Sequence, residues 1–291
     1  MTVYEANKIV RDFYNLTNPT EEETFVFTEA LRFLIEETKN PEYMTELGGQ
    51  YYGERNFDLA LKYYELAAEY DYLPAISGLG YIWYYGRTGE KNYEKAFNYF
   101  NRGFELGDIN CSYKVADMYK NGYFVEKDFE KYKSIIEKIY SHIKYRGDYH
   151  IPEICTRLAK IRSDEGETEE ALALYDRARA HLSFRIQDNP FFGNLTIMKY
   201  LILDTYKLRE FDKSDMGLYD LYYVLSSPAK VTFVFDFEKH RAESEAQEDG
   251  SVAVCFDGRW FRTVDDFFAK AEINGELLTA LYEELYDFEV E

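Results

Sequence analysis

A short pattern of small and aromatic residues recurs along this chain and constrains its fold more than any other feature. In the first copy, a Leu-Gly pair and an aromatic residue are followed by an alanine, a tyrosine and a second alanine at helical spacing: Leu47, Gly48, Tyr51, Ala60, Tyr64 and Ala67. The pattern returns after Leu79, Val115 and Leu158. A repeated helix pair cannot bury its apolar face alone, so several copies must stack into one continuous core. Such an array presents an extended binding surface rather than a catalytic pocket.

The small positions of the pattern have a physical explanation. Small residues are expected where two helices cross closely, at Gly48, Gly80, Ala116 and Ala159 in the first helices and at Ala60, Ala96 and Ala171 in the second. The aromatic residue four positions after each second-helix alanine lies one turn further along the helix. It is therefore expected to fill the gap toward the next pair.

The four copies differ in the length of the turn between their paired helices. From the small residue of the first helix to the alanine position of the second, the spacing is 12 residues in copies one and four and 16 in copies two and three. These spacings are measured over Gly48–Ala60, Ala159–Ala171, Gly80–Ala96 and Ala116–Tyr132. The turns that contain Gly86 and Gly122 are therefore predicted to be longer than the turns near Glu54 and Gly166.

Over residues 40–185 this pattern resembles the tetratricopeptide repeat family, and copies two and three look like its Sel1-like branch. The residues that carry the Sel1-like resemblance are Gly78, Leu79, Gly80, Trp83, Gly86, Tyr93, Ala96, Tyr99 and Phe100. Copies one and four look like ordinary tetratricopeptide repeats. Two departures, Tyr132 in place of alanine and Arg162 in place of tyrosine, indicate looser or specialised packing. The resemblance implies a mostly α fold, a right-handed α–α superhelix of stacked helix pairs, and a general role as a protein-binding scaffold.

Further helix pairs are predicted on both sides of the four copies. Residues 2–15 are expected to form a helix with a rough apolar stripe, and Thr20-x-x-Glu23 is a capping box that opens a second helix through about Thr38. After copy four, helices are expected over 194–209 and 215–225. The helical repeat domain with its capping pairs is therefore expected to span residues 1–228.

From residue 230 the apolar period changes from that of a helix to that of a strand. Val231, Phe233, Phe235 and Phe237 alternate with other residues, as strand residues do. Asp249-Gly250 and Asp257-Gly258 mark turns around a strand at 251–256. Thr263-x-x-Asp266 caps a helix, and a last helix is expected over 277–286. Residues 229–291 are therefore predicted to form a small α+β module, which resembles no family that we recognise.

The net charge limits the classes of partner that the protein can bind, and the cysteines indicate its cellular compartment. The formal net charge of −20 opposes binding to nucleic acid, which requires Lys and Arg to neutralise phosphates, and to anionic membrane surfaces. The three cysteines, Cys111, Cys155 and Cys255, form no C-x-x-C motif and fit a reducing compartment. No secretion signal or apolar membrane span is visible in the sequence. We therefore expect a cytoplasmic protein with no nucleic-acid and no membrane partner.

The sequence contains none of the common catalytic, nucleotide-binding or metal-binding motifs. G-x-x-x-x-G-K-[ST], G-x-G-x-x-G, H-E-x-x-H and G-x-S-x-G are all absent. The four histidines show no metal-ligand spacing, so no catalytic residue, cofactor or metal is predicted. One alternative is an enzyme whose site uses Asp236, Glu238, His240 or Cys255. Another is a homo-oligomer joined through Phe233, Phe235 and Phe237, and the sequence leaves the oligomeric state open.

The predicted partner-binding residues follow from the repeat geometry. In repeats of this kind the first helix of each pair lines the concave surface, and residues two and five positions after the core leucine, or two before it, leave the core face. These positions give Tyr52, Tyr81, Tyr84 and Tyr113, with Asp117 and Lys120 beside them. Aromatic anchors with a charged flank suit the capture of a protein or peptide. The alternative is that some of these tyrosines pack between helices. Our first hypothesis is a non-enzymatic scaffold or adaptor.

Overall fold

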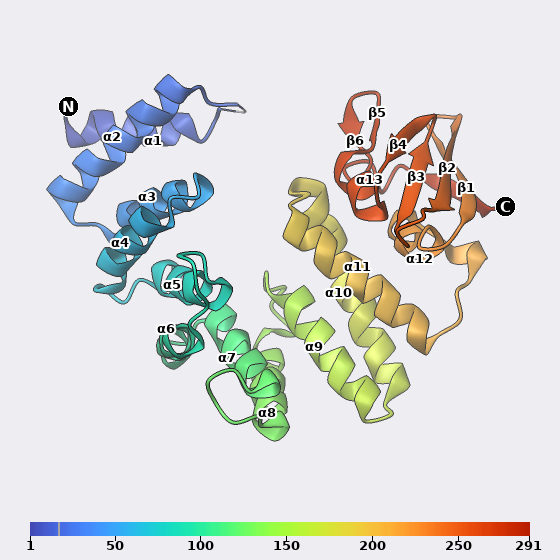
Figure 1. The fold of residues 1–291 in the computed structure, drawn as a ribbon, viewed down its shortest axis with the longest axis horizontal. Coiled ribbons are helices and arrows are strands. Elements are labelled where there is room, and N and C mark those ends of the chain that lie inside the picture. Colours follow the sequence, from blue (N-terminus) through green and yellow to red (C-terminus); the bar gives the residue numbers. More distant parts are fainter. Residues whose placement is uncertain (17) are drawn as a thin grey trace. The chain divides into compact units, whose positions relative to one another are not determined.

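The computed structural model describes residues 1–16 and 18–291, apart from the side chain of Phe192. The chain folds as two compact units, Met1–Ile139 and Tyr140–Glu291. The first consists of helices, and the second combines helices with a small sheet (Figure 1). The predicted boundary between domains 1–228 and 229–291 stays a prediction.

The first unit is a row of antiparallel helix pairs (Figure 1). Its helices are α1 (Val3–Phe13), α2 (Glu21–Thr38), α3 (Pro41–Gly53), α4 (Phe57–Ala68), α5 (Leu73–Tyr85), α6 (Tyr93–Glu105), α7 (Ile109–Asn121) and α8 (Phe129–Ile143), the last of which continues past the unit boundary. From α1 to α7, each helix packs against the next one in sequence. The capping box of Thr20 and Glu23 is present at the start of α2, as the sequence predicts.

The small residues lie at the helix crossings, as predicted. A Cβ atom added to Gly48 would come within 2.7 Å of the Tyr64 ring, and one added to Gly80 would collide with Phe100. Tyr64 also faces Gly78 of the next pair, at 3.0 Å from an added Cβ. Tyr64 and Phe100 therefore fill the space that these glycines leave. The alanines at the equivalent crossings are fully buried, namely Ala60, Ala96, Ala116, Ala159 and Ala171.

The predicted difference in turn length is confirmed. Three residues separate the paired helices in copies one and four (54–56 and 165–167), and seven separate them in copies two and three (86–92 and 122–128). Both longer turns start with a glycine in the left-handed region, at φ 65° for Gly86 and φ 71° for Gly122. At Gly86 an added Cβ would also lie 2.7 Å from the Lys91 backbone nitrogen, so this turn requires glycine.

The second unit begins with the fourth repeat copy and its closing helices. These helices are α9 (Ile151–Asp164), α10 (Thr168–Asp188) and α11 (Phe192–Leu208). At the turn between α9 and α10, the Arg162 guanidinium lies 2.9–3.2 Å from the carboxylates of Glu165, Glu167 and Glu170. The arginine that replaces a tyrosine in this copy therefore holds the turn by ion pairs.

The predicted helix over 215–225 is formed only in part. This segment contains two short 3-10 helices, η1 (Lys213–Asp215) and η2 (Leu218–Asp220), and one turn of helix, α12 (Leu221–Val224). Asp220 is fully buried and accepts hydrogen bonds from Arg179 at 2.6 and 2.9 Å and from the Tyr206 hydroxyl at 2.6 Å. It also accepts from the Gly217 backbone nitrogen. These contacts with α10 and α11 fix an irregular backbone that local sequence does not specify.

The C-terminal module is a five-stranded antiparallel sheet in the order β4-β3-β2-β1-β7. Its strands are β1 (Ala229–Phe235), β2 (Glu238–Ala246), β3 (Val252–Phe256), β4 (Arg259–Phe261) and β7 (Tyr286–Val290). The helix α13 (Val264–Lys270) packs against β3 and β4, and β5 (Glu272–Ile273) and β6 (Glu276–Leu277) form a separate hairpin. The turns at Asp249-Gly250 and Asp257-Gly258 and the Thr263 cap are where the sequence predicts them.

The predicted last helix over 277–286 is wrong. Leu278, Leu281 and Leu285 are buried, so their spacing imitates a helix, but the chain forms turns there and continues into β7. β7 pairs with β1 and completes the sheet. The pairing of two strands this far apart in sequence leaves no local signal. Phe237 is likewise not on a sheet face with Phe233, because it lies in the β1–β2 turn at φ 64° and is 92% exposed.

The module shares a core with the closing helices of its unit. The ring of Tyr222 stacks on Phe268 of α13 with 3.8 Å between centroids, and Tyr219 lies 5.8 Å from Tyr282. Lys199 of α11 forms an ion pair of 2.7 Å with Asp265. Both tyrosines that close this core are almost fully buried.

Candidate protein-binding surface

The six predicted binding residues lie on the first helices of three successive pairs in the first unit. Tyr52 is on α3, Tyr81 and Tyr84 are on α5, and Tyr113, Asp117 and Lys120 are on α7. Asp117 and Lys120 occupy the positions in copy three that Tyr81 and Tyr84 occupy in copy two, 36 residues earlier. The two copies therefore present different chemistry on the same helix face.

Tyr81 and Tyr113 join α5 to α7. The Tyr81 hydroxyl donates to Asn110 Oδ1 at 2.8 Å and lies 3.5 Å from the Tyr113 hydroxyl. The Tyr81 ring is stacked on that of Tyr85, and Tyr113 is only 7% exposed. Burial, followed by the neighbouring Tyr113, raises the pKa of Tyr81 far above that of a free phenol. Tyr113 thus holds Tyr81 in place and offers little surface of its own.

Tyr84 is partly exposed and sits in a second aromatic group. Its ring lies 5.6 Å from Tyr93 and 6.0 Å from Tyr123, and those two rings are stacked at 4.4 Å. Burial, and then the negative charge of Asp117, raise the pKa of Tyr84. Tyr93 is the first residue of α6, and Tyr123 lies in the turn between α7 and α8. The sequence prediction considered only positions on the first helices and therefore did not include these two residues.

Lysine and arginine side chains connect these rings, which the sequence did not predict. Lys114 Nζ lies between 5.2 and 5.7 Å from the ring centroids of Tyr81, Tyr84 and Tyr113. A cation within about 6 Å of a ring centroid is attracted by the negative face of the ring. Lys114 directly follows Tyr113 in the sequence, and this adjacency was the one sequence signal that could have pointed to a cation beside the predicted tyrosines.

Tyr52 is linked to the same surface through Arg87. Arg87 Nε donates to the Tyr52 hydroxyl at 2.9 Å, and the guanidinium carbon lies 5.2 Å from the ring centroid of Tyr85. Tyr85 is 46% exposed. A continuous set of contacts, here called the aromatic–cation row, therefore extends over Tyr52, Arg87, Tyr85, Tyr81, Lys114, Tyr84 and Tyr113. Lys120 lies beside it, with its Nζ 5.0 Å from the centroid of Tyr132.

The residues considered for an enzymatic site in the C-terminal module do not converge. His240 lies on the buried face of β2, with its Nδ1 2.6 Å from Asp257 Oδ2. Cys255 is paired with Glu243, which is an odd number of positions from His240, so the two side chains lie on opposite faces of the sheet. Asp236 and Glu238 lie at the exposed β1–β2 turn.

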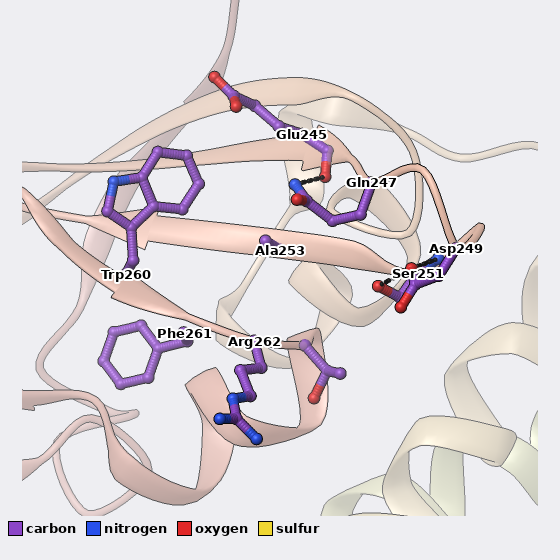
Figure 2. A pocket seen from close by; sticks show the side chains of 9 residues that line it. Glu245, Gln247, Asp249, Ser251, Ala253, Trp260, Phe261 and Arg262 are labelled. Carbon is purple, nitrogen blue, oxygen red and sulfur yellow. Dashed lines mark hydrogen bonds between the residues drawn. The ribbon is translucent and has the colours of Figure 1, made fainter.

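The module also carries a surface cavity of about 680 Å³ (Figure 2). Its lining comes from the end of β2, the following turn, β3 and β4, with the Trp260 ring at one end and Asp249 and Ser251 at the other. Trp260 is 54% exposed, and Arg262 also lines the cavity. The four residues considered for catalysis lie elsewhere in the module.

Over residues 1–16 and 18–291, no three His, Cys, Asp or Glu side chains are grouped to hold a metal ion. Within the same ranges, no helix combines the length and the apolar character that crossing a membrane requires.

Repeated antiparallel helix pairs with glycine and alanine at their crossings define a helical repeat protein. The Sel1 repeat family model matches residues 41–69, 73–108 and 109–131, which correspond to α3–α4, α5–α6 and α7 with the start of α8. The chain therefore contains three Sel1 repeats, and the predicted resemblance is confirmed. Copy one, whose short turn looks like an ordinary tetratricopeptide repeat, matches the Sel1 model as well. No curated protein sequence matches the chain.

Solved structures of repeat proteins are similar to this chain. A Sel1 repeat protein from Oxalobacter formigenes is 21% identical with a TM-score of 0.52, over 72% of this chain and 80% of the other. The protein c5321, a protective antigen of uropathogenic Escherichia coli strains with an SLR fold, is 16% identical with a TM-score of 0.49, over 71% of this chain and 50% of the other. The first likeness shows that the fold is a helical repeat array, as the sequence predicts.

Proposed function

We propose that this protein is a non-enzymatic scaffold that binds a segment of another protein through the aromatic–cation row. Sel1 and tetratricopeptide-like repeat scaffolds generally mediate protein interactions. The observation that carries the proposal is that partly exposed tyrosines of α3 and α5 are joined by Arg87 and by Lys114 of α7 into one surface.

The contacts within the row explain how it would bind. Tyrosine supplies a large apolar ring and a polar hydroxyl with little side-chain entropy to lose, and it is enriched at binding hot spots. Because Tyr81 is already fixed by Asn110 and Tyr113, binding would require little reordering of the surface. Asp117 and Lys120 would orient the bound segment and contribute less to affinity.

The test is the capture of partners from native cell extract. Changing Tyr81 and Tyr84 together to serine should abolish capture and leave the helical circular-dichroism signal nearly intact. Tyr4→Ser is the matched control, because Tyr4 is 77% exposed on α1 and outside the row. Retention of the same partner by the double variant would show that the row is not the site.

A milder pair of changes covers the case in which the double variant unfolds. Tyr85→Ser with Arg87→Ala alters two exposed members of the row and leaves the Tyr81–Asn110 hydrogen bond in place. Loss of partner capture by the Tyr85→Ser, Arg87→Ala protein, with its fold intact, supports the proposal. Collapse of the double variant together with full capture by the milder one would assign the tyrosines to the core.

A module variant tests the alternative of a site in residues 229–291. Deletion of the module would expose Tyr219 and Tyr222, so a point change is the cleaner probe. Trp260→Ser alters the exposed end of the surface cavity in Figure 2. The proposal expects no effect of this change on partner capture.

A further inference from the structure

A separate cavity of about 370 Å³ opens between the first helix pair and α3. One wall is aromatic and comes from the end of α1 and from α2, with Phe13, Tyr14 and Phe27. The other wall is a face of α3 that carries Glu46, Gly53 and Glu54. All of these residues belong to the first compact unit.

The aromatic wall is a packed group of three rings. Phe13 and Phe27 are stacked at 4.0 Å, and Tyr14 meets Phe27 edge-on at 5.9 Å. Phe27 is buried, whereas Tyr14 is 60% exposed. Ring faces carry negative electrostatic potential and attract cations, and several rings together form the aromatic cages that hold ammonium groups.

The opposite wall carries the partly buried carboxylate of Glu46. Among the described residues, Glu46 Oε2 is buried with no hydrogen-bond partner. The Tyr14 hydroxyl lies close to the same carboxylate. Burial, and then the nearby Glu42, raise the pKa of Glu46, whereas the Tyr14 hydrogen bond lowers it. A buried charge is costly unless it is paired, so a cation in the cavity would relieve this cost.

Space and charge at the mouth of the cavity also suit a cation. Gly53 leaves room on the α3 wall, because a Cβ added there would meet no atom within 4 Å. Glu54 places a second carboxylate at the rim and accepts a hydrogen bond from Gln50 Nε2 at 3.0 Å. The volume lies in the range of small-molecule sites and is sufficient for one long side chain.

We propose that this cavity binds an organic cation, a guanidinium or alkylammonium group, with its charge on Glu46 and its body against the rings of Phe13, Tyr14 and Phe27. The cation would be an arginine or lysine side chain of a bound protein or a free small molecule. The site is independent of the aromatic–cation row, because the two share no residue. Failure of either proposal therefore leaves the other intact.

The first experiment is an NMR titration that follows the ring resonances of Phe13, Tyr14 and Phe27. The probes are N-acetyl-arginine amide, N-acetyl-lysine amide and tetramethylammonium, with N-acetyl-citrulline amide as the neutral copy of arginine. At least one cation should give saturable shifts, and citrulline should bind about tenfold more weakly than arginine, as expected for the loss of a charged contact. Equal shifts with citrulline, or no saturation with any cation, would overturn the proposal.

Two variants test the walls of the cavity. Glu46→Gln keeps the shape of the side chain and removes its charge, and it should weaken cation binding about tenfold. Glu37→Gln, an exposed carboxylate on α2, is the matched control and should change nothing. Gly53→Leu should block the cavity and leave Glu46 unchanged. Full cation binding by both Glu46→Gln and Gly53→Leu would place the cation elsewhere.

The last comparison distinguishes the two sources of the cation. A short peptide with one arginine between apolar residues is titrated beside the arginine amide. Tighter binding of the peptide, by about tenfold, assigns the cavity to a side chain of a protein partner, because neighbouring residues then add contacts. Equal affinities assign it to a free organic cation.

Discussion

The second and fourth repeat copies share a helix-pair pattern but are held together by different chemistry. Around α5 and α7 the side chains that connect neighbouring pairs are aromatic, with Tyr81 bonded to Asn110 and Tyr84 against Tyr123. Within the fourth copy, the side chains that join α9 to α10 are ionic: Arg162 contacts three glutamates, and Arg185 forms an ion pair of 2.8 Å with Glu153 in which both side chains are nearly buried.

The difference indicates where a partner can bind. The ion pairs of the fourth copy satisfy one another within the fold and hold its own helices. The partly exposed tyrosines of the second copy keep polar and apolar surface that another chain can cover. The first unit is therefore the better candidate for binding, and the second unit is expected to depend more on salt and on charge. The following predictions test this comparison, from the largest expected effect to the smallest.

The largest effect is expected from the buried ionic contact of the second unit. Asp220→Ala should lower the free energy of unfolding by about 3–5 kcal/mol, because it leaves the Arg179 guanidinium without its buried partner. Urea unfolding followed by circular dichroism measures the loss. Adding Arg179→Met should recover part of the stability. An Asp220→Ala protein as stable as the parent would show that the contact does not hold this segment.

Overpacking should have the next largest effect, in the aromatic region. Ala96 is fully buried at a helix crossing, so Ala96→Leu should cost about 1–3 kcal/mol. Asn98→Leu places the same side chain on the exposed face of α6 and serves as the control. Thermal melts compare the two. Equal midpoints for both variants and the parent would contradict the helix register.

A smaller effect is expected at the turn of the fourth copy. Arg162→Met should cost about 1 kcal/mol, since a partly screened group of ion pairs is lost and three carboxylates remain together. The cost should shrink in high salt because carboxylate repulsion is screened. Arg209→Met, which removes a more exposed pair with Asp176, should change stability less. Urea melts at two salt concentrations distinguish these outcomes.

The smallest effect at neutral pH concerns a tyrosine of the first copy. Burial, and then the nearby Tyr52, raise the pKa of Tyr64 to about 12, whereas an unfolded phenol titrates near pH ~10. Because the folded-state pKa is the higher one, the contribution of the neutral Tyr64 to the free energy of unfolding is present in full below pH ~10. It is lost as the pH rises toward ~12, because the phenol then ionises more readily in the unfolded chain. Tyr64→Phe should therefore flatten the alkaline fall in stability, which urea melts across this pH range measure. An unchanged alkaline profile would contradict the assignment.

Much of the helical array could be predicted because its signals are local. The Thr20–Glu23 capping box and the four extra residues of the long turns are each contained in a few neighbouring positions. The residues of the candidate site could be predicted only in part from the sequence. Counting along the first helices found Tyr81 and Tyr84 but not Lys114, whose importance comes from the rings around it.

By itself, the sequence determined the helix pairs, their crossings and their turns, because helical spacing and left-handed glycines act within one or two turns of chain. Only the tertiary structure decided that the segment 277–286 forms turns and leads into the strand Tyr286–Val290, since pairing with the edge of β1 outweighed an apolar spacing typical of a helix. It likewise brought Arg87 to Tyr52 and Tyr14 to Glu46, 35 and 32 residues apart. Contacts of this kind depend on which surfaces pack together after the helices have formed. Short-range sequence patterns carry no information about that packing.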